Sequence, residues 1–391
     1  MRTQVGIVGA GPAGLLLSHL LHLQGISSVI LEARDRPYIE NRIRAGVLEQ
    51  GTVDVLTEAG VGERMHREGL YHRGTSIRFQ GANHEIDFVE LTGKAVRVYA
   101  QHEVVKDLVA ARLAAGGDIR FEAQVGGIEG LQSDRAAIHF TQNGTPQTLE
   151  CDFIAGCDGF HGPCKEFIPT ELLQTYDRVY PFGWLGILAQ APPSQDELIY
   201  ANHDRGFALY SMRSPEITRH YIQVPPDEDI AQWPDEKIWE ELHLRLSVPG
   251  NDPVIDGPIL QKSVTAMRSF VQEPMRHGRL FLAGDAAHIV PPTGAKGMNL
   301  AVADVRVMAQ GLDSFYRTGS TALLDRYSEI CLRRVWRAQH FSWWMTSMLH
   351  KFGPDNDFDR HRQMAELQAV TSSEAGMRYL AENYVGIPFE T

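Results

Sequence analysis

The sequence has little cysteine, no excess of basic residues and no long hydrophobic run. It has 37 Lys and Arg against 49 Asp and Glu, a formal net charge of −12, which makes nucleic acid or an anionic membrane a poor partner. No apolar run reaches the roughly 18 residues of a membrane span, and we recognise no signal peptide. The cysteines have no CxxC spacing, so we expect neither a disulfide framework nor a metal site; they are Cys151, Cys157, Cys164 and Cys331. These absences predict a cytoplasmic protein and leave open a small anionic ligand held by local arginines.

The 391 residues are enough for about two to three domains. The first thirty residues have the pattern of a βαβ unit, and aromatic and β-branched runs between 180 and 224 predict an antiparallel sheet. We therefore expect an α/β fold with a Rossmann-like parallel sheet, an antiparallel sheet and a helical C-terminal region. The predicted domains are 1–175 completed by 268–315, then 176–267, which 73–96 is expected to join, and 316–391. Helices are predicted at 15–23, 101–115, 297–312 and in most of the last eighty residues, and a hairpin turn at 143–144.

A glycine-rich turn, Gly9-Ala10-Gly11-Pro12-Ala13-Gly14, lies between the first strand and the first helix, and Glu32 ends the second strand. The first glycine permits the tight turn, the second lets a pyrophosphate approach the backbone, and the third lets helix and strand pack closely. The N–H groups at the start of the helix favour an anion, and Glu32 can accept hydrogen bonds from ribose hydroxyls. The turn predicts a nucleotide but does not distinguish FAD from NAD.

Two later segments favour FAD. Asp158-Gly159 follows one predicted strand, and Gly284-Asp285 follows another, where the Asp285 carboxylate can accept a hydrogen bond from a ribityl hydroxyl. A further helix begins near Gly297, and its free N–H groups suit the N1–C2=O edge of a flavin.

These three motifs together resemble the class A flavoprotein monooxygenases, which hydroxylate phenols. Longer runs resemble the members of that family that act on 4-hydroxybenzoate; they are residues 42–51, 180–186, 198–203, 341–347 and 381–386. The resemblance implies hydroxylation of 4-hydroxybenzoate to 3,4-dihydroxybenzoate with FAD, NAD(P)H and O2, through a flavin C4a-hydroperoxide, by a homodimer. The alternatives are the same chemistry on 3-hydroxybenzoate or salicylate, a non-hydroxylating flavin oxidase, and a flavin-binding sensor.

The resemblance also implies a substrate site. Arg213 would pair with the substrate carboxylate, helped by Ser211 and Tyr221, and a guanidinium suits this because it forks onto a carboxylate with two hydrogen bonds. A phenolate is a better nucleophile than a phenol, so the buried site needs a path for the phenol proton. The residues implied for this path are Tyr200 on the phenol, Tyr384 on Tyr200, His72 toward solvent and the carbonyl of Pro292 on the phenol.

Cofactor contacts are implied in the same way. For FAD they are Gly9, Gly11, Ala13, Gly14, Glu32, Arg42, Arg44, Gln101, Asp158, Arg219, Asp285, Lys296, Gly297 and Asn299. For NAD(P)H they are Arg34, Tyr38, His161 and Arg268. Two features depart from the family: Ala33 follows Glu32 where NADPH-specific members have a basic residue, and Cys164-Lys165 replaces Ser-Arg. The sequence therefore leaves the choice between NADH and NADPH open.

Overall fold

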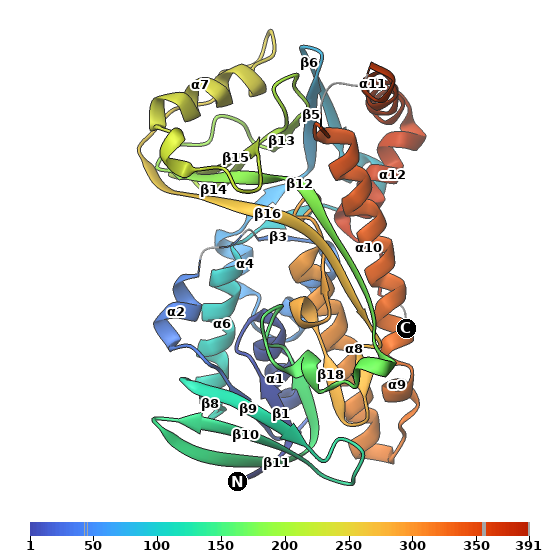
Figure 1. Cartoon of the computed structure of the whole chain (residues 1–391). Helices are drawn as coiled ribbons and strands as arrows, with labels where there is room; N and C mark the ends of the chain where they lie inside the picture. Colours follow the sequence, from blue (N-terminus) through green and yellow to red (C-terminus); the bar gives the residue numbers. More distant parts are fainter. Residues whose placement is uncertain (43, 45, 354–356, 390–391) are drawn as a thin grey trace.

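The computed structural model describes residues 1–42, 44, 46–353 and 357–389. Ile43 and Ala45, in the run 42–51, lie outside the described residues, as do 354–356 and 390–391. Figure 1 shows two large sheets, one at each end of the molecule, with helices between and beside them. The fold is α/β with a Rossmann-like sheet, an antiparallel sheet and a helical C-terminal region, as predicted. The division into domains stays a prediction.

The first sheet has the order β17-β18-β11-β1-β2-β8, with β10 and β9 continuing from β11. Strand β1 pairs in parallel with both β2 and β11, as a βαβ unit requires. The predicted turn at Asn143-Gly144 joins β10 to β11, and both residues have the positive φ of a tight hairpin. The strands are β1 Arg2–Val8, β2 Ser28–Leu31, β8 Asp118–Arg120, β9 Ala123–Glu129, β10 Ala136–Gln142, β11 Thr145–Gly156, β17 Arg276–His277 and β18 Leu280–Leu282.

Helix α1 (Pro12–Leu23) packs against α6 (Gln101–Ala114) and α8 (Gly297–Thr318) beside this sheet. It begins three residues earlier than predicted because Pro12 fits the first position of a helix, where no N–H partner is needed. Helix α8 is longer than predicted, and it ends where Gly319 takes a left-handed conformation (φ 76°). Four short helices complete this part: α2 Arg36–Asn41, α3 Gln50–Glu58, α4 Glu63–Glu68 and the 3-10 turn η4 Gly284–Ala286.

The second sheet has the order β19-β16-β12-β15-β14-β13-β5-β6. It is antiparallel as predicted, except that β13 pairs in parallel with β5, so residues 74–87 belong to it. The long strands β12 and β16 extend from this sheet toward the first one (Figure 1). The strands are β5 Gly74–Phe79, β6 Ala82–Asp87, β12 Gln174–Ala189, β13 Leu198–Ala201, β14 Ala208–Ser214, β15 Ile217–Val224, β16 Ile259–Glu273 and β19 His288–Ile289. A small third sheet contains β3 Val47–Leu48, β4 Leu70–His72 and β7 Val96–Val98, and two helices border the second sheet, α5 Phe88–Thr92 and α7 Asp235–Leu246.

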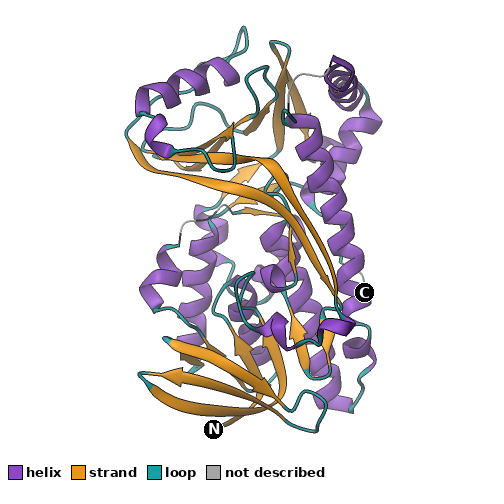
Figure 2. Cartoon of the chain, viewed as in Figure 1, coloured by secondary structure: helices purple, strands orange, loops and turns teal. Residues whose placement is uncertain are grey.

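The last part of the described chain is helical, as predicted. Helix α10 runs along the molecule from the first sheet to the second (Figure 2). At its end, Asn202, the residue after β13, donates from Nδ2 to Leu349 O (3.2 Å), and just beyond the helix Gln223 on β15 donates from Nε2 to Lys351 O (2.7 Å). These contacts tie the helical region to the strands that carry the site. The helices are α9 Ala322–Asp325, α10 Tyr327–Leu349, α11 Asp357–Ser372 and α12 Glu374–Val385.

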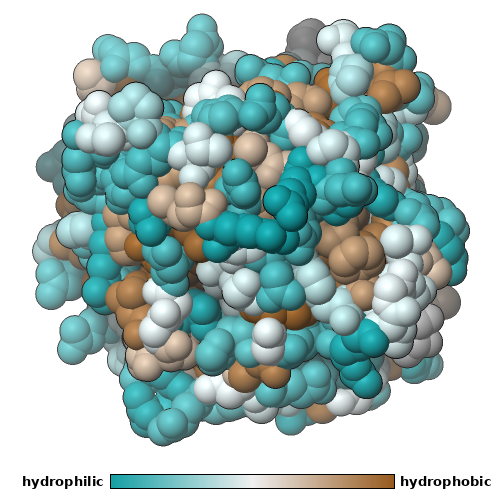
Figure 3. Space-filling view, turned by 90° about the horizontal axis from the view of Figure 1, so that it is seen from below, coloured by the Kyte–Doolittle hydropathy of each residue, from teal (hydrophilic) through white to brown (hydrophobic). Residues whose placement is uncertain are grey.

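The surface seen in Figure 3 is mainly hydrophilic, with small separate apolar patches. Such patches are ordinary on a folded protein. Within the described part of the chain, no helix combines the length and the apolar character needed to cross a membrane.

Candidate functional site

The glycine-rich turn has the geometry that a nucleotide pyrophosphate needs. A Cβ on Gly9 (φ 101°) would lie 2.4 Å from Cys157 O, and one on Gly14 would lie 2.0 Å from Gly9 O. Packing therefore requires both glycines. A Cβ on Gly11 would meet nothing within 4 Å, so open space lies in front of the start of α1, where Ala13 is buried in the first turn. This open approach to free N–H groups fits a pyrophosphate.

Glu32 stabilises the same turn. Its Oε2 accepts a hydrogen bond from Ala10 N (2.7 Å), and its Oε1 accepts one from Arg34 N (2.8 Å). Each carboxylate oxygen has a second lone pair, so Glu32 can hold the turn and still accept from a ribose hydroxyl.

Two aspartates lie beside the turn. Asp158 Oδ2 accepts from Cys164 N (2.8 Å), but its Oδ1 is buried without a partner among the described residues, and burial raises the pKa of this carboxyl. Asp285, in η4, is half exposed, and its Oδ2 lies 3.9 Å from Arg44 Nη1. Burial lowers the pKa of Arg44. Since buried polar atoms are normally paired, the open oxygen of Asp158 fits a polar group of FAD, and the half-exposed Asp285 and Arg44 leave polar groups open for its ribityl and phosphate parts.

Gln101 is the first residue of α6, which has no side-chain cap, and it is half buried without a hydrogen bond to its side chain among the described residues. Arg219 does not extend toward the glycine turn: its Nε donates to Tyr221 Oη (2.9 Å) in the second sheet. The contacts of Gln101 and Arg219 with FAD stay predictions.

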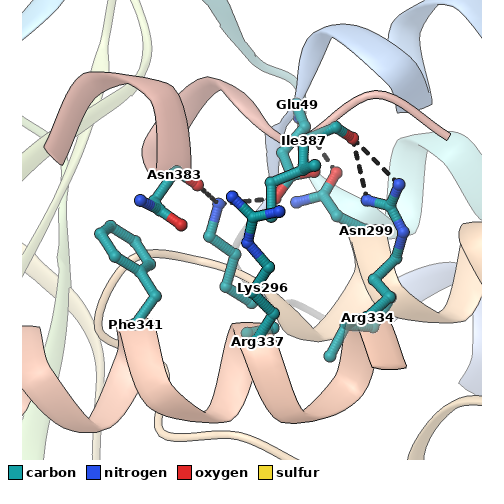
Figure 4. A pocket seen from close by; sticks show the side chains of 10 residues that line it. Glu49, Lys296, Asn299, Arg334, Arg337, Phe341, Asn383 and Ile387 are labelled. Carbon is teal, nitrogen blue, oxygen red and sulfur yellow. Dashed lines mark hydrogen bonds and ion pairs between the residues drawn. The ribbon is translucent and has the colours of Figure 1, made fainter. Parts of the chain in front are cut away.

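Lys296 and Asn299, at the start of α8, are held by protein groups. Lys296 Nζ lies 2.6 Å from Glu49 Oε1 and also donates to the carbonyls of Asn383 and Tyr384 (Figure 4). Burial lowers the pKa of Lys296. Asn299 Oδ1 accepts from Glu49 N, and its Nδ2 donates to Val47 O. These side chains tie α8 to β3 and α12, whereas a Cβ on Gly297 would meet nothing within 4 Å, so its backbone stays open to a flavin edge.

Tyr200 on β13 and Tyr384 on α12 meet as predicted. Their Oη atoms are 2.6 Å apart, and both side chains are buried. Burial raises the pKa of Tyr200 to about 12 and that of Tyr384 well above its usual range. Both phenols are therefore neutral at physiological pH and can each donate one proton while accepting another.

Arg213 has no counterion in the described structure. It lies on β14, its Nη1 donates to Met212 O (3.2 Å), and its Nε is buried without a partner among the described residues. Burial lowers the pKa of Arg213. Among the described residues no carboxylate forms an ion pair with this half-buried guanidinium, which agrees with the predicted role in binding an external anion, and that role stays a prediction.

The predicted helpers of Arg213 lie on the same pair of strands. Ser211 faces Arg219 across β14 and β15, and its Oγ donates to Arg219 O (3.1 Å). Leu209 pairs with Tyr200 on one side and with Tyr221 on the other, so the two tyrosines share one row of the sheet, about 10 Å apart. The sheet thus brings together the residues predicted to bind the substrate carboxylate and the tyrosine predicted to bind the substrate phenol. The Pro292 carbonyl accepts from Ala295 N (2.9 Å) in a turn, and its contact with a substrate stays a prediction.

His72 ends β4 and is fully buried. Its Nδ1 lies 3.1 Å from Oε2 of Glu197, a partner that the sequence did not predict. The local signal for Glu197 is its place three residues before Tyr200, but the contact with His72 is set by strand pairing, which the sequence does not show.

The residues predicted for NAD(P)H form two groups. In the first, the guanidinium carbon of Arg34 lies 5.3 Å from the ring centre of Tyr38; Arg42, which was predicted to contact FAD instead, lies 5.9 Å from the same ring, and that FAD contact stays a prediction. At the other group, His161 and Arg268 both contact the ring of Phe160. Both groups offer the positive charge that a coenzyme phosphate needs, and their role stays a prediction.

Trp184 is a further wall of the site that the sequence analysis did not single out. Its ring centre lies 4.7 Å from that of Tyr221, and its Nε1 donates to His350 Nε2 (2.7 Å). Burial lowers the pKa of His350 to about 3, so this imidazole is a neutral acceptor that fixes the Trp184 ring.

Comparison with known proteins agrees with this geometry. The chain matches the family model described as an FAD binding domain over residues 2–342. It is 50% identical to the p-hydroxybenzoate hydroxylase of Acinetobacter baylyi over 100% of this chain and 96% of that protein. It is 26% identical to a probable NADH-specific resorcinol 4-hydroxylase of Rhodococcus jostii, over 83% of this chain and 61% of that protein.

Solved structures show the same fold. The p-nitrophenol 4-monooxygenase of Pseudomonas putida has a TM-score of 0.85 and 20% identity, with 99% of each chain covered. The chain belongs to the FAD-binding family of flavoprotein aromatic hydroxylases.

Proposed function

We propose that this enzyme hydroxylates 4-hydroxybenzoate to 3,4-dihydroxybenzoate with NAD(P)H and O2. The observation that carries the proposal is the Arg213 guanidinium, which has no counterion among the described residues and lies on the same sheet as Tyr200, whose hydroxyl meets that of Tyr384 on α12. A benzoate with a hydroxyl para to its carboxylate supplies an anion at one end and a phenol at the other. The name of the relative with 50% identity supports this substrate.

Arg213 binds the substrate carboxylate with charge-assisted hydrogen bonds, and Ser211 and Tyr221 offer hydroxyls beside it. At the other end the substrate hydroxyl donates to Tyr200 Oη. Tyr200 in turn donates to Tyr384, and a water carries the proton from Tyr384 toward His72. Moving this proton leaves a phenolate, whose ring is a stronger nucleophile at the ortho carbon.

FAD supplies the redox chemistry that activates O2 when it is bound. The chain orients the substrate ring and keeps water away from it with buried aromatic side chains, of which Trp184 and Tyr221 form one wall. We also propose that NAD(P)H binds through its phosphates at the groups around Tyr38 and Phe160, and that the enzyme acts in the cytoplasm.

We further propose that the enzyme is a homodimer. Helix α10 exposes Trp336 (41%) and Trp343 (39%) along one face, with His340 between them. The Tyr379 hydroxyl is 3.1 Å from His340 Nε2, and the Tyr176 ring packs on Trp336, which widens this aromatic surface. Light scattering should give twice the mass of the chain, and Trp336→Lys with Trp343→Lys should shift the equilibrium toward the monomer.

The proposed function is tested with 2-, 3- and 4-hydroxybenzoate, each with NADH and with NADPH. We expect the 4-isomer to stimulate coenzyme oxidation and to give 3,4-dihydroxybenzoate by mass spectrometry. Stimulation by another isomer alone would overturn the substrate. Stoichiometric H2O2 without hydroxylated product would indicate an oxidase, and purified protein without flavin absorbance would indicate that the proposal fails at the cofactor.

A further inference from the structure

Glu197 links the buried His72 to the surface. Oε2 of Glu197 lies 3.1 Å from Nδ1 of His72, and both atoms are buried and make no hydrogen bond among the described residues, so each is free to bond the other. The His72 side chain is fully buried, whereas the Glu197 side chain is 28% exposed. A proton that reaches His72 therefore meets a carboxylate before it meets solvent.

Strand pairing fixes the position of this carboxylate. Strand β13 pairs in parallel with β5, with Leu198 opposite Thr75. The residues just before the two strands therefore lie side by side at the end of the sheet where both strands begin. Oε1 of Glu197 accepts a hydrogen bond from Arg73 N (2.8 Å), which leaves Oε2 for His72. The Arg73 guanidinium pairs with Asp87 instead (3.1 Å). Glu197 is thus oriented by a backbone N–H and not neutralised by the nearest arginine.

We propose that Glu197 is the outer group of the proton path, which accepts the phenol proton from His72 and delivers it to solvent. This inference rests on the proposed function. His72 Nε2 is buried and has no partner in the described chain, so it is the open acceptor on the inner side. As Nε2 gains a proton, the Nδ1–H passes its proton to Oε2 of Glu197, which is buried, and the partly exposed Glu197 side chain then turns to release that proton to water. Only N–H and O–H bonds change, and no electrons are transferred.

The charged and titratable groups around this pair are few. Arg73 and Asp87 lie on β5 and β6 and pair with each other, and Tyr384 approaches from α12. Burial, Tyr200 and Glu197 all raise the pKa of Tyr384, which places the Glu197 charge within electrostatic range of the inner end of the path. A carboxylate at this end favours the movement of a positive charge outward from the tyrosines.

The test measures the rate at which a proton is released when 4-hydroxybenzoate binds to the FAD-loaded enzyme. The rate is measured by stopped flow in weak buffer that contains a pH indicator dye. Glu197→Gln keeps the size of the side chain and an oxygen for Arg73 N but removes the acceptor for the proton. We expect release to slow by roughly tenfold or more, with substrate affinity unchanged, and Glu197→Asp to restore part of the rate. Asp196→Asn is the matched control, because it removes a neighbouring exposed carboxylate that does not contact His72.

An unchanged rate in Glu197→Gln would overturn the inference. If His72→Asn and Tyr200→Phe slow release while Glu197→Gln does not, only the role of Glu197 fails. If none of the three slows release, the proton path of the proposed function fails and the role of Glu197 fails with it. Flavin absorbance and circular dichroism of each variant show whether it is folded, and Glu197→Asp gives a second, smaller change should Glu197→Gln not fold.

Discussion

Arg64 and Arg213 lie in two regions that treat a guanidinium in opposite ways. Arg64, on α4, donates to Asp107 Oδ1 (2.7 Å) and to Glu103 on α6. Burial opposes the charge of Arg64, but these carboxylates outweigh it and raise its pKa. Arg213 donates to a backbone carbonyl and has Tyr200, Tyr221 and Arg219 near it, but no carboxylate pairs with it among the described residues, and burial lowers its pKa. The first arginine brings its own counterions, whereas the second lacks one.

This difference separates a structural charge from a binding charge. Around Arg64 the cost of removing charges from water is offset within the chain, so the cluster contributes to stability. Around Arg213 no carboxylate of the described residues offsets the cost, and under the proposed function the substrate carboxylate does so, so the same kind of side chain would contribute to affinity. Tyrosines follow the same division: the Tyr99 hydroxyl donates to Asp107 (2.6 Å), while the Tyr200 hydroxyl meets only Tyr384 and backbone.

The largest expected effect is that of Arg213→Ala on substrate affinity. Removing the partner of a buried carboxylate should weaken binding of 4-hydroxybenzoate by about 2–5 kcal/mol, or roughly 30- to 5,000-fold. The melting temperature should not fall, because the free protein loses a charge that has no counterion. Titration of flavin absorbance and thermal unfolding measure both quantities. If affinity fell by less than tenfold, or if stability fell markedly, Arg213 would have a structural role like that of Arg64 and the proposed role in substrate binding would be wrong.

Tyr200→Phe should have the next largest effect. It removes a hydrogen bond to the substrate phenolate worth about 1.5–3 kcal/mol. The pKa of the bound phenol should therefore rise by about 1–2 units, since each unit corresponds to roughly 1.4 kcal/mol. The absorbance of bound 4-hydroxybenzoate against pH measures this pKa. Tyr99→Phe is the matched control and should leave it unchanged; an equal effect of both variants would remove the distinction between the two regions.

Arg64→Met should change stability and leave binding alone. It leaves Glu103 and Asp107 without their shared partner, but the cluster is partly exposed to water. We therefore expect a loss of about 1–2 kcal/mol in the free energy of unfolding, below that of a fully buried pair. Denaturant unfolding of the FAD-loaded enzyme measures it. A weaker affinity for 4-hydroxybenzoate with unchanged stability would contradict a structural role.

The sequence was sufficient for the local parts of this picture. The glycine turn, the Asn143-Gly144 hairpin and the helical C-terminal region follow from short patterns, and the structure confirms them. Contacts between distant segments were not predictable without the resemblance. Lys296 pairs with Glu49, which lies 247 residues earlier in the chain. The sequence analysis predicted Lys296 as an FAD contact and did not predict Glu49 as its partner.

The parallel pairing of β13 with β5 was also missed, because neighbouring β-rich runs favour an antiparallel meander. That pairing places Glu197 at His72. Because the pairing was not predicted, Glu197, the group that we propose for the outer end of the proton path, was not predicted either. For Arg213 the sequence was informative and the structure added the missing part. The resemblance implied that Arg213 binds the substrate carboxylate, and the structure shows that no carboxylate of the described residues pairs with it.

The smallest expected effect concerns His288, a buried imidazole whose charge is balanced by the carboxylate of Asp304. Its Nε2 lies 2.7 Å from Asp304 Oδ2, which also accepts from Gly284 N (2.9 Å) beside Asp285. Burial acts to lower the pKa of His288, but Asp304 outweighs it and the pKa is raised. The stability from this shift is therefore fully present below the unfolded pKa of about 6.5 and is lost as pH rises through the higher folded pKa.

His288→Gln should thus lower the melting temperature of the FAD-loaded enzyme more at pH 6 than at pH 9, by about one to two degrees. His139→Gln is the control, because His139 forms a similar 3.1 Å pair with Glu129 on the exposed surface. Solvent screens that pair, so its removal should give little pH dependence. A His288→Gln effect that grows with pH would mean that the buried imidazole is neutral, and the Asp304 carboxylate would then lack a counterion, as Arg213 does.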